Sequence, residues 1–306
     1  MTNADRILEA LRTQGDLDDD ELSIRGGVRP RQQVNQLCRR LEAQGRIARV
    51  VGSNGKLVNR LLDAGPGSAR SIRQLREPAT RYEVGPAFDS AAELQQTLFL
   101  LPCSARKATG GQSAMEGASL HESLPSNLRA RLLSARRRVA EASQLDSDLL
   151  LPAYRRYTGY LYGAAAAALR RAVQAGLHVL IISGGYGVVH AAEPVGWYER
   201  VFSKRDWPDG ILADAIAQYA QIHQLHHARA FLASSSSYYK LLNDLDWQSA
   251  GIVDAQLITP IVVGGGSMVK TPRALGEGFS AYVDKTLTSN WRSSDGASLR
   301  TISLSP

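Results

Sequence analysis

Apolar residues in the first part of the chain recur at the spacing of helices. In "ADRILEALRTQG", Ile7, Leu8 and Leu11 share one helical face and Gly15 ends the segment, so we expect a helix there. The acidic stretch "DLDDDELSIRGG" predicts a short second helix and a turn. A third helix is predicted within "RPRQQVNQLCRRLEAQG", where the apolar residues at i, i+3, i+4, i+7 spacing are Val34, Leu37, Cys38 and Leu41.

The pattern changes to alternation after the third helix. "RIARVVGSNGKLVNRLL" alternates on both sides of Asn54 and Gly55, a dipeptide that is typical of a type I′ hairpin turn. The following "AGPGSARSIRQLREPATRYEVGPAF" is rich in Gly, Pro, Ser and Arg, which predicts a linker or a wrapping arm. We therefore place a first domain at residues 1–63 and a basic linker at 64–92.

From residue 93 onward, strand-like and helix-like segments alternate. "TLFLLP", "HVLIISG", "ARAFLAS" and "AQLITPIVVGGG" are apolar runs that are typical of buried strands. Between or after them, "PSNLRARLLSARRRVAEAS", "GAAAAALRRAVQAG", "DGILADAIAQYAQIHQL" and "SYYKLLNDL" predict helices. This alternation predicts that residues 93–306 form an α/β fold, in which a mostly parallel sheet has helices on both faces. The Ser/Thr-rich tail from residue 283 is expected to be partly disordered or to pack as an extended arm.

The distribution of charged residues indicates what kind of partner the first domain binds. The formal net charge is +7 and the isoelectric point is near 9.5, which favours a polyanionic partner. Between Arg25 and Arg60 the chain has nine Lys or Arg residues and a single acid, Glu42. Basic charge is thus concentrated on the third helix and the hairpin.

Helix, helix, helix and hairpin in this order resemble the winged helix-turn-helix family. The resemblance implies contacts to double-stranded DNA, through phosphates and through base edges. The residues placed for these contacts are Arg29, Arg31, Gln32, Gln33, Asn35, Arg39 and Lys56. The alternative is a winged helix that binds proteins and keeps its basic face solvated.

Composition also excludes some classes of protein. No apolar stretch approaches the roughly 20 residues of a membrane span, and the first residues have no signal-peptide pattern, so no membrane partner is expected. Two cysteines, Cys38 and Cys103, provide no disulfide framework. We therefore expect a cytoplasmic protein.

Four motifs follow or flank the predicted strands. They are "LPCSARK", "LPAYRRYTGYLYG", "SGGYGVVHAAEP" and "ASSSSYYK". Because ligands of open α/β sheets bind at the carboxyl ends of the strands, we expect these motifs to converge. By itself, the glycine-rich turn is equally typical of a connection without any site.

Several common sites are not predicted. The spacing of Gly184, Gly185 and Gly187 differs from a dinucleotide-binding fingerprint, and "ASSSSYYK" lacks the pattern of a phosphate-binding P-loop. "HQLHHAR" has histidines at i, i+3, i+4, but no acid or Cys completes a ligand set nearby. We expect no metal and no cofactor.

Taken together, "PCSARK", "YRRYTGYLY", "ISGGYGVV…EP…WY" and "ASSSSYYK" resemble the YaaA type of proteins, which are linked to DNA and oxidative damage; the match covers residues 97–245. "PCSARK" also resembles the P-C-x-x-x-K start of a motif in archaeosine synthase, although the following P-Y and the later Ser/His spacing are absent. Both groups resemble the fold of the uracil-DNA glycosylase superfamily, which implies two loops that grip an extruded nucleotide. Bacterial anti-phage glycosylases that remove modified cytosines are another group of possible relatives.

These motifs could form a pocket with a glycine floor and tyrosine walls that stacks a flipped base. The residues predicted to bind substrate are Cys103, Ser104, Tyr154, Tyr157, Ser183, Gly184, Gly185, Tyr186, Tyr198, Ser234 and Ser236. Two of these assignments have plain alternatives: Cys103 could be a packing residue or the nucleophile of a different chemistry, and the serines could cap a helix.

Cleavage of an N-glycosidic bond needs a carboxylate near the sugar. Glu193, held by the following Pro194, is the first choice, and Asp206 is a reserve. Glu193 could instead be a salt-bridging carboxylate. Lys107 could hold a phosphate or, if it is desolvated, act as an amine nucleophile.

The sequence therefore predicts a DNA glycosylase acting on a modified or damaged base. The alternatives are a non-catalytic protein that binds DNA, either protecting it under stress or regulating transcription with a ligand-sensing domain, and a Cys-dependent transferase or hydrolase. The identity of the base, its origin in host or invading DNA and the oligomeric state are left open.

Overall fold

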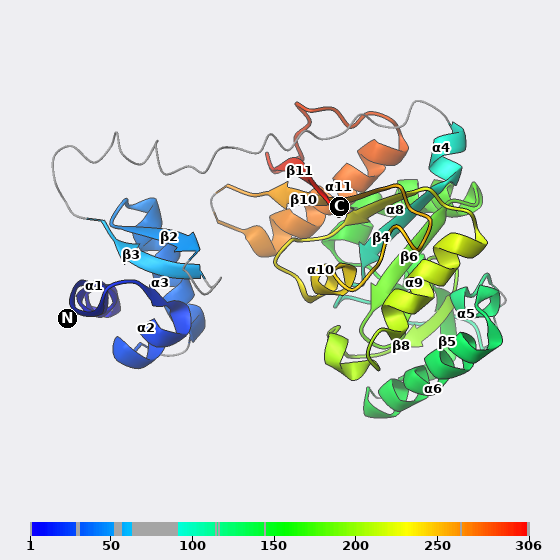
Figure 1. Cartoon of the computed structure of the whole chain (residues 1–306), viewed down its shortest axis with the longest axis horizontal. Coiled ribbons are helices and arrows are strands. Elements are labelled where there is room, and N and C mark those ends of the chain that lie inside the picture. Colours follow the sequence, from blue (N-terminus) through cyan, green and yellow to red (C-terminus); the bar gives the residue numbers. More distant parts are fainter. Residues whose placement is uncertain are drawn as a thin grey trace. The chain divides into compact units, whose positions relative to one another are not determined.

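The computed structural model describes residues 2–28, 31–51, 57–62, 91–113, 115, 117–143, 145–263 and 265–304. The chain divides into two compact units, Met1–Thr80 and Arg81–Pro306 (Figure 1). The division falls within the segment predicted as a linker. Within the described ranges, no helix has the length and apolar character needed to cross a membrane.

Helices and a three-stranded antiparallel sheet form the first unit. The sheet order is β1-β3-β2, and the elements along the chain are α1 (Asn3–Gln14), β1 (Leu17–Asp18), α2 (Asp19–Arg25), α3 (Arg31–Ala43), β2 (Ile47–Val51) and β3 (Leu57–Leu61). The residues predicted to share helical faces pack into one core with Leu17 and Ile47. Capping boxes at Thr2 and Asp18 define the first residues of α1 and α2. The predicted helices and hairpin are therefore confirmed, while the turn at 52–56 lies outside the described residues.

A six-stranded sheet of order β11-β10-β9-β4-β6-β7 forms the centre of the second unit. Its four inner strands are parallel, and both edge strands are antiparallel to their neighbours. The strands are β4 (Thr97–Pro102), β6 (His178–Ser183), β7 (Gly187–His190), β9 (His227–Phe231), β10 (Asp254–Ile261) and β11 (Ser298–Ser303). The mostly parallel sheet predicted from the apolar runs is thus confirmed, and the tail contributes an edge strand.

Helices cover both faces of this sheet (Figure 1). Alternate residues of β4 point to opposite sides, so that Leu98 and Leu100 join one core and Phe99 and Leu101 join the other. The first core includes α6 (Ser126–Ala142) and α9 (Ile211–Ile222), and the second includes α8 (Tyr160–Gln174) and α11 (Ser267–Val283). Three shorter helices are α4 (Ala91–Gln95), α5 (Leu120–Ser123) and α10 (Ser237–Leu242).

A small second sheet and a short helix lie next to the carboxyl edge. β5 (Asp146–Pro152) pairs with β8 (Pro194–Trp197), and α7 (Ala153–Arg156) follows β5 directly. The guanidinium of Arg156 is fully buried and donates to the carbonyls of Ala108, Leu149 and Val195. Arg156 therefore ties the loop after β4 to both strands of the small sheet, because it satisfies three carbonyls from different segments.

Candidate functional site

Two neighbouring parallel strands carry the best-defined cluster of chemical groups. The chain runs from β4 to β6 on one side and then crosses to β9 on the other side of β4, so β4 and β9 flank a topological switch point. Cys103 lies in the loop after β4 and Tyr238 lies in α10, the helix that follows β9, and the Cys103 thiol is 3.3 Å from the Tyr238 hydroxyl. Ligand sites of open α/β sheets lie at such points.

A triangle of hydroxyls lies at the same edge, formed by Ser183 at the end of β6, Tyr157 directly after α7 and Tyr198 directly after β8. The Ser183 hydroxyl lies 3.1 Å from the Tyr157 hydroxyl and 2.8 Å from the Tyr198 hydroxyl, and the two tyrosine oxygens are 2.9 Å apart. All three residues are buried. Burial raises the pKa of both tyrosines, so their hydroxyls stay protonated at neutral pH and can donate hydrogen bonds.

Lys107 lies against this triangle. Its ammonium nitrogen is 4.2 Å from the centre of the Tyr198 ring and 3.5 Å from the carbonyl oxygen of Ala105. Its backbone forms an antiparallel bridge with Tyr157. Burial lowers the pKa of Lys107, while Cys103 and Glu199 act in the opposite direction. We call Cys103, Lys107, Tyr157, Ser183, Tyr198 and Tyr238 the carboxyl-edge cluster.

The tyrosine-rich segment before α8 packs directly on the loop after β4. The Tyr162 hydroxyl donates to the carbonyl of Pro102 at 2.8 Å. A methyl group added at Gly159 would lie 2.1 Å from the Ser104 hydroxyl, so the Ser104 side chain would have to move to admit any larger residue. Ser104 also accepts a hydrogen bond from the backbone of Arg106. The four motifs therefore converge as predicted: "LPAYRRYTGYLYG" contacts both "LPCSARK" and "SGGYG", and Tyr238 of "ASSSSYYK" contacts Cys103.

The glycines of "SGGYG" make room for the protein's own atoms. A Cβ at Gly184 would lie 2.2 Å from the backbone oxygen of Arg200, and one at Gly185 would lie 2.7 Å from the Tyr198 ring. The Tyr186 hydroxyl accepts from the backbone of Gly196 at 2.8 Å, and its ring centre is 5.8 Å from that of Tyr198. These contacts position Tyr198, while the roles of Gly184, Gly185 and Tyr186 in binding a base stay predictions.

Glu193 is the centre of a separate, buried polar group. It accepts from Arg136 at 2.7 Å, from the backbone of Leu120 at 2.9 Å and from the backbone of His190 at 3.1 Å. Burial alone would raise the pKa of Glu193, but Arg136 and the hydrogen bonds lower it to about 2. The side chain is 3% exposed and borders a cavity of about 500 Å³ that Tyr186 and Gly185 also line.

This arrangement matches the salt-bridging alternative for Glu193. The carboxylate is ionised at any ordinary pH and its charge is balanced by Arg136, whose other nitrogens donate to the carbonyls of Tyr186 and Val188. A catalytic role stays a prediction. No pattern predicted this role for Arg136, because the segment "SARRRVAEAS" is typical of a helix with a solvated basic face.

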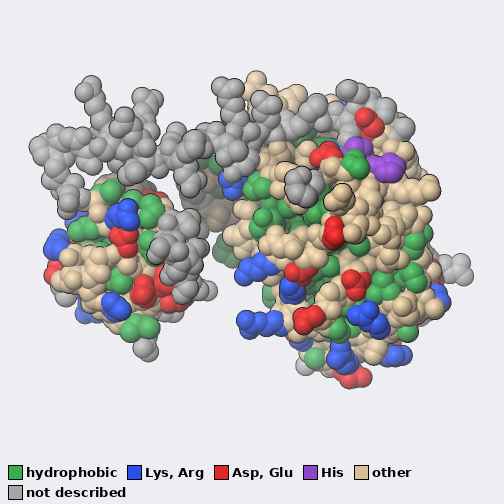
Figure 2. All heavy atoms as spheres, viewed as in Figure 1, with side chains coloured by type: hydrophobic (Ala, Val, Ile, Leu, Met, Phe, Trp, Pro, Cys, Tyr) green, Lys and Arg blue, Asp and Glu red, His purple; other side chains and the backbone are tan. Residues whose placement is uncertain are grey.

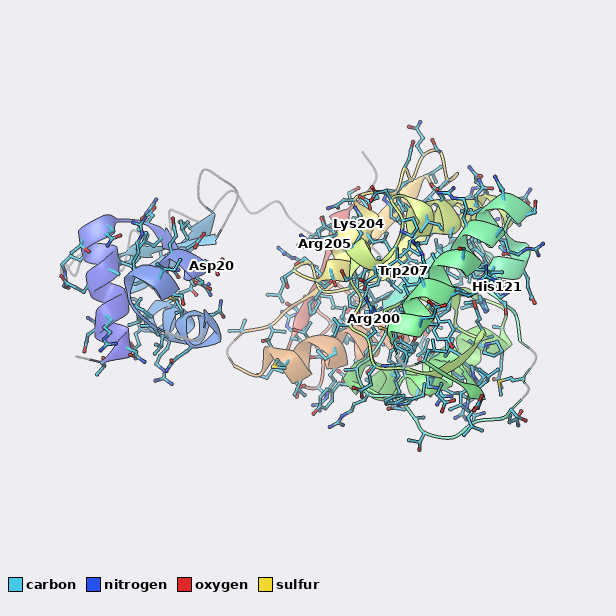
Figure 3. The ribbon with its side chains drawn as sticks, turned by 90° about the horizontal axis from the view of Figure 1, so that it is seen from below. Asp20, His121, Arg200, Lys204, Arg205 and Trp207 are labelled. Atoms are coloured by element: carbon cyan, nitrogen blue, oxygen red, sulfur yellow. The ribbon has the colours of Figure 1, made fainter. Side chains whose placement is uncertain are left out.

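Four other predicted residues are not part of the carboxyl-edge cluster: Tyr154, Asp206, Ser234 and Ser236. Asp206 forms an ion pair with Arg200, at 2.8 Å, in the loop before α9 where Figure 3 labels Arg200. Ser236 caps α10 by accepting from the backbone of Tyr239, and the Ser234 amide donates to Thr259. Tyr154 packs half-buried against the core under α8.

A buried polar network in the first unit was not predicted. Asp19 accepts from Asn35 at 2.6 Å, from Asn59 at 3.0 Å and from Arg49 at 2.9 Å. Asn35, predicted to read bases, is thus bound to Asp19, and Gln33 is half-buried on α3. The side chains of Arg31, Gln32 and Arg39, and all of Arg29 and Lys56, lie outside the described residues.

Charge on the second unit is mixed. On the face in Figure 2, basic side chains are interspersed with acidic ones. One local exception is Tyr160, 40% exposed, whose ring has Arg106 at 5.6 Å and Arg273 at 5.7 Å from its centre. Tyr160 and Arg106 belong to the segments that build the carboxyl-edge cluster, so this aromatic and cationic surface adjoins it.

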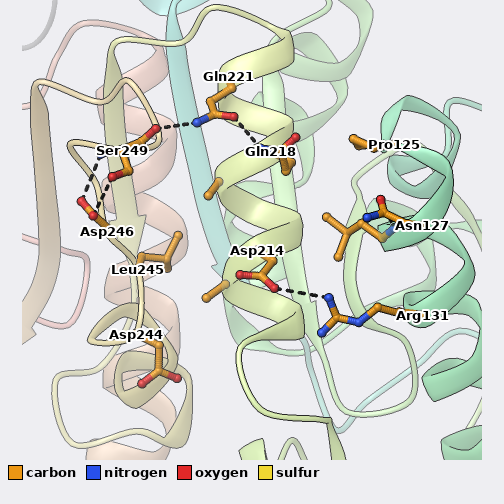
Figure 4. A pocket seen from close by; sticks show the side chains of 13 residues that line it. Pro125, Asn127, Arg131, Asp214, Gln218, Gln221, Asp244, Leu245, Asp246 and Ser249 are labelled. Atoms are coloured by element: carbon orange, nitrogen blue, oxygen red, sulfur yellow. Dashed lines mark hydrogen bonds and ion pairs between the residues drawn. The ribbon is translucent and has the colours of Figure 1, made fainter.

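A separate groove with a volume of about 540 Å³ lies between α6, α9 and the segment 244–249 (Figure 4). Its polar wall includes the Arg131–Asp214 ion pair and a hydrogen bond from Gln221 to Ser249. None of its lining residues belongs to the carboxyl-edge cluster.

Comparisons of the chain with protein-family models, with curated proteins and with solved structures found no match.

Proposed function

We propose that this chain is a DNA-binding enzyme that processes a nucleobase, specifically a DNA glycosylase that flips a modified or damaged base from the duplex and breaks its N-glycosidic bond. The observation that carries the proposal is the meeting, in the carboxyl-edge cluster, of side chains from the loop after β4, from the end of β6 and from the helix after β9. The cluster lies at the switch point, where such folds bind ligands. Unstacking a base from the duplex costs a few kcal/mol. Stacking of the flipped base on an aromatic ring, on the order of 1–3 kcal/mol, would offset part of this cost.

The first unit supports the DNA-binding part of the proposal. Its order of three helices and three strands resembles that of winged helices, in which the third helix enters the major groove. Arg40 on α3 and Arg46 before β2 are exposed and suited to phosphate contacts. Arg49 and Arg60 contribute less, because each forms an ion pair with an aspartate of the same unit.

A second candidate is a DNA-binding protein without catalytic activity, such as a regulator that senses a small molecule. The observation in its favour is the Arg136–Glu193 pair, which neutralises the acid at the cavity beside Tyr186. A carboxylate balanced in this way is a poor partner for a cationic sugar. This candidate predicts salt-dependent DNA binding and no change in the DNA.

The test is incubation of the pure protein with duplex DNAs that contain normal, damaged and modified bases. Free bases are measured by mass spectrometry, and abasic sites by alkaline cleavage. Glycosylase activity predicts release of one class of base, reduced at least tenfold by Tyr157→Phe, because that change removes one hydroxyl of the triangle. Tyr239→Phe on α10 is the matched control, since its hydroxyl is outside the cluster.

Tight binding without release from any DNA would overturn the glycosylase proposal and favour the second candidate. Equal loss of release in both tyrosine variants would mean that the carboxyl-edge cluster is not the site. Glu193→Gln, measured in parallel at a temperature where it is folded, reports whether the acid takes part in the reaction.

A further inference from the structure

Lys107 is placed unlike an ordinary surface lysine. Its side chain is half-buried, and its nitrogen lies over the Tyr198 ring at 4.2 Å from the centre. Among the described residues its ammonium group forms no ion pair with a carboxylate, and its hydrogen bond to the Ala105 carbonyl is long at 3.5 Å. Cys103 and Ser104 beside it are also half-buried, so the cluster is open on this side.

This environment distinguishes the two roles that the sequence allows for Lys107. A lysine that holds a phosphate stays charged and hydrated. Here, burial lowers the pKa of Lys107 more than Cys103 and Glu199 raise it, while the Tyr198 ring favours the charged form through a cation–π contact. A partly desolvated amine that is not ion-paired with a carboxylate is typical of a lysine nucleophile.

We propose that Lys107 is the nucleophile of the reaction, with its Nζ attacking C1′ of the flipped nucleotide; this rests on the proposed glycosylase function. The amine lone pair forms the N–C1′ bond, and the glycosidic bond breaks with its electron pair leaving on the base. The sugar ring then opens to an imine between Lys107 and C1′. One amine proton ends on the base and the other on O4′ of the opened sugar. Water hydrolyses the imine and restores the amine.

Tyr198 is a positioning residue in this scheme. Its ring covers one side of the Lys107 amine, and its hydroxyl is held by Ser183 and Tyr157. Gly185 lies against the same ring and keeps it in place. The hydroxyl triangle therefore fixes the ring that keeps water from one side of the amine.

The test uses the full chain and a duplex DNA that contains one abasic site, so that the base need not be known. Sodium cyanoborohydride reduces an imine to a stable amine, which makes a covalent protein–DNA product visible on a denaturing gel. We expect a product whose cross-linked peptide contains Lys107, and at least a hundredfold less of it with Lys107→Arg. Arginine keeps the charge but is not an amine nucleophile.

Lys240→Gln is the matched control, because Lys240 is an exposed lysine of α10 near the same edge. It is expected to give the same yield of product as the unchanged chain. A product mapped to another amine, or full trapping in Lys107→Arg, would overturn the assignment. Because the mapping uses the unchanged chain, it does not depend on the folding of any variant.

The same samples separate this inference from the function on which it rests. Base release from the DNA panel without any trapped product would overturn the role of Lys107 and leave the glycosylase proposal intact, since water would then be the nucleophile. The absence of both release and trapping would overturn both.

Discussion

Arg136 and Glu193 form an ion pair of 2.7 Å in which both side chains are at least nine-tenths buried. The pair joins α6 to the turn between β7 and β8, and it receives further hydrogen bonds from the Leu120 and His190 backbones. The net contribution of this pair to the free energy of unfolding is smaller than the loss caused by removing one partner, because the other charge would then remain buried and unpaired.

Glu193→Gln is therefore expected to destabilise the second unit by about 3–5 kcal/mol. Urea unfolding at neutral pH measures this difference. Asp214→Asn is the control, because its pair with Arg131 is exposed and spans 3.8 Å; it is expected to change stability by less than about 1 kcal/mol. Equal effects of the two changes would contradict the structural role of Glu193.

The same carboxylate predicts a decrease in stability in acid. The pKa of Glu193 is about 2 in the folded protein and about 4.5 in the unfolded chain, so the unfolded chain binds a proton first as the pH falls. Its contribution is fully present above pH 4.5 and is lost between about pH 4.5 and 2, by about 3 kcal/mol. Urea unfolding across this range checks the slope, which Glu193→Gln should lack.

The neighbouring histidines His178, His190 and His223 predict a second pH range in which stability decreases. Burial and the neighbouring His223 and His190 lower the pKa of His178 to about 4, and its ring nitrogen lies 3.0 Å from the Tyr219 hydroxyl. Because the unfolded value is higher, stability from this residue is present above pH 6.5 and is lost as the pH falls towards 4. His178→Gln should flatten the decrease in melting temperature between these pH values; an unchanged slope would contradict the assignment.

Gly185→Ala tests the packing behind Tyr198. The added methyl group would lie 2.7 Å from the ring, so we expect a loss of about 1–3 kcal/mol and a larger relative loss of base release and imine trapping. Gly163→Ala is the control: it lies within α8 with open space around it and is expected to stabilise by about 0.5–1 kcal/mol. Thermal unfolding and the trapping assay are measured on both variants.

Asn35→Ala distinguishes a structural amide from one that reads bases. Because its amide donates to the buried Asp19, we expect a loss of about 1–3 kcal/mol in local stability, visible as faster hydrogen exchange in α2, α3 and β3. Gln33→Ala, on the same helix, is expected to leave exchange unchanged. Altered sequence preference in Asn35→Ala with unchanged exchange would support base reading instead.

Local patterns predicted most of the regular structure. The apolar runs correspond to β4, β6, β9 and β10, and the amphipathic segments to α6, α8 and α9, because period and burial are both local properties of the sequence. The small β5–β8 sheet and the edge strand β11 were not predicted, because their sequences lack the long apolar runs of the inner strands and their pairing depends on partners far along the chain.

The site was predicted less completely for a similar reason. "PCSARK" and "SGGYG" identified Lys107 and Ser183, but their contacts with Tyr198 and Tyr157 depend on the strand order. The partners of the acids were not predicted either, because Arg136 lies 57 residues from Glu193 in a helix that looks solvated. Charge counting also overstated the basic surface, since Arg49 is buried against Asp19.

The most direct test of the central claim is the ratio of free base to abasic sites formed when the pure protein acts on duplex DNA. Mass spectrometry quantifies the base, and an aldehyde-reactive probe quantifies the sites in the same sample. Cleavage of an N-glycosidic bond predicts one free base for every abasic site, with both reduced at least tenfold in Tyr157→Phe. Modified DNA without free base, or bound DNA recovered unchanged from every substrate, would contradict it.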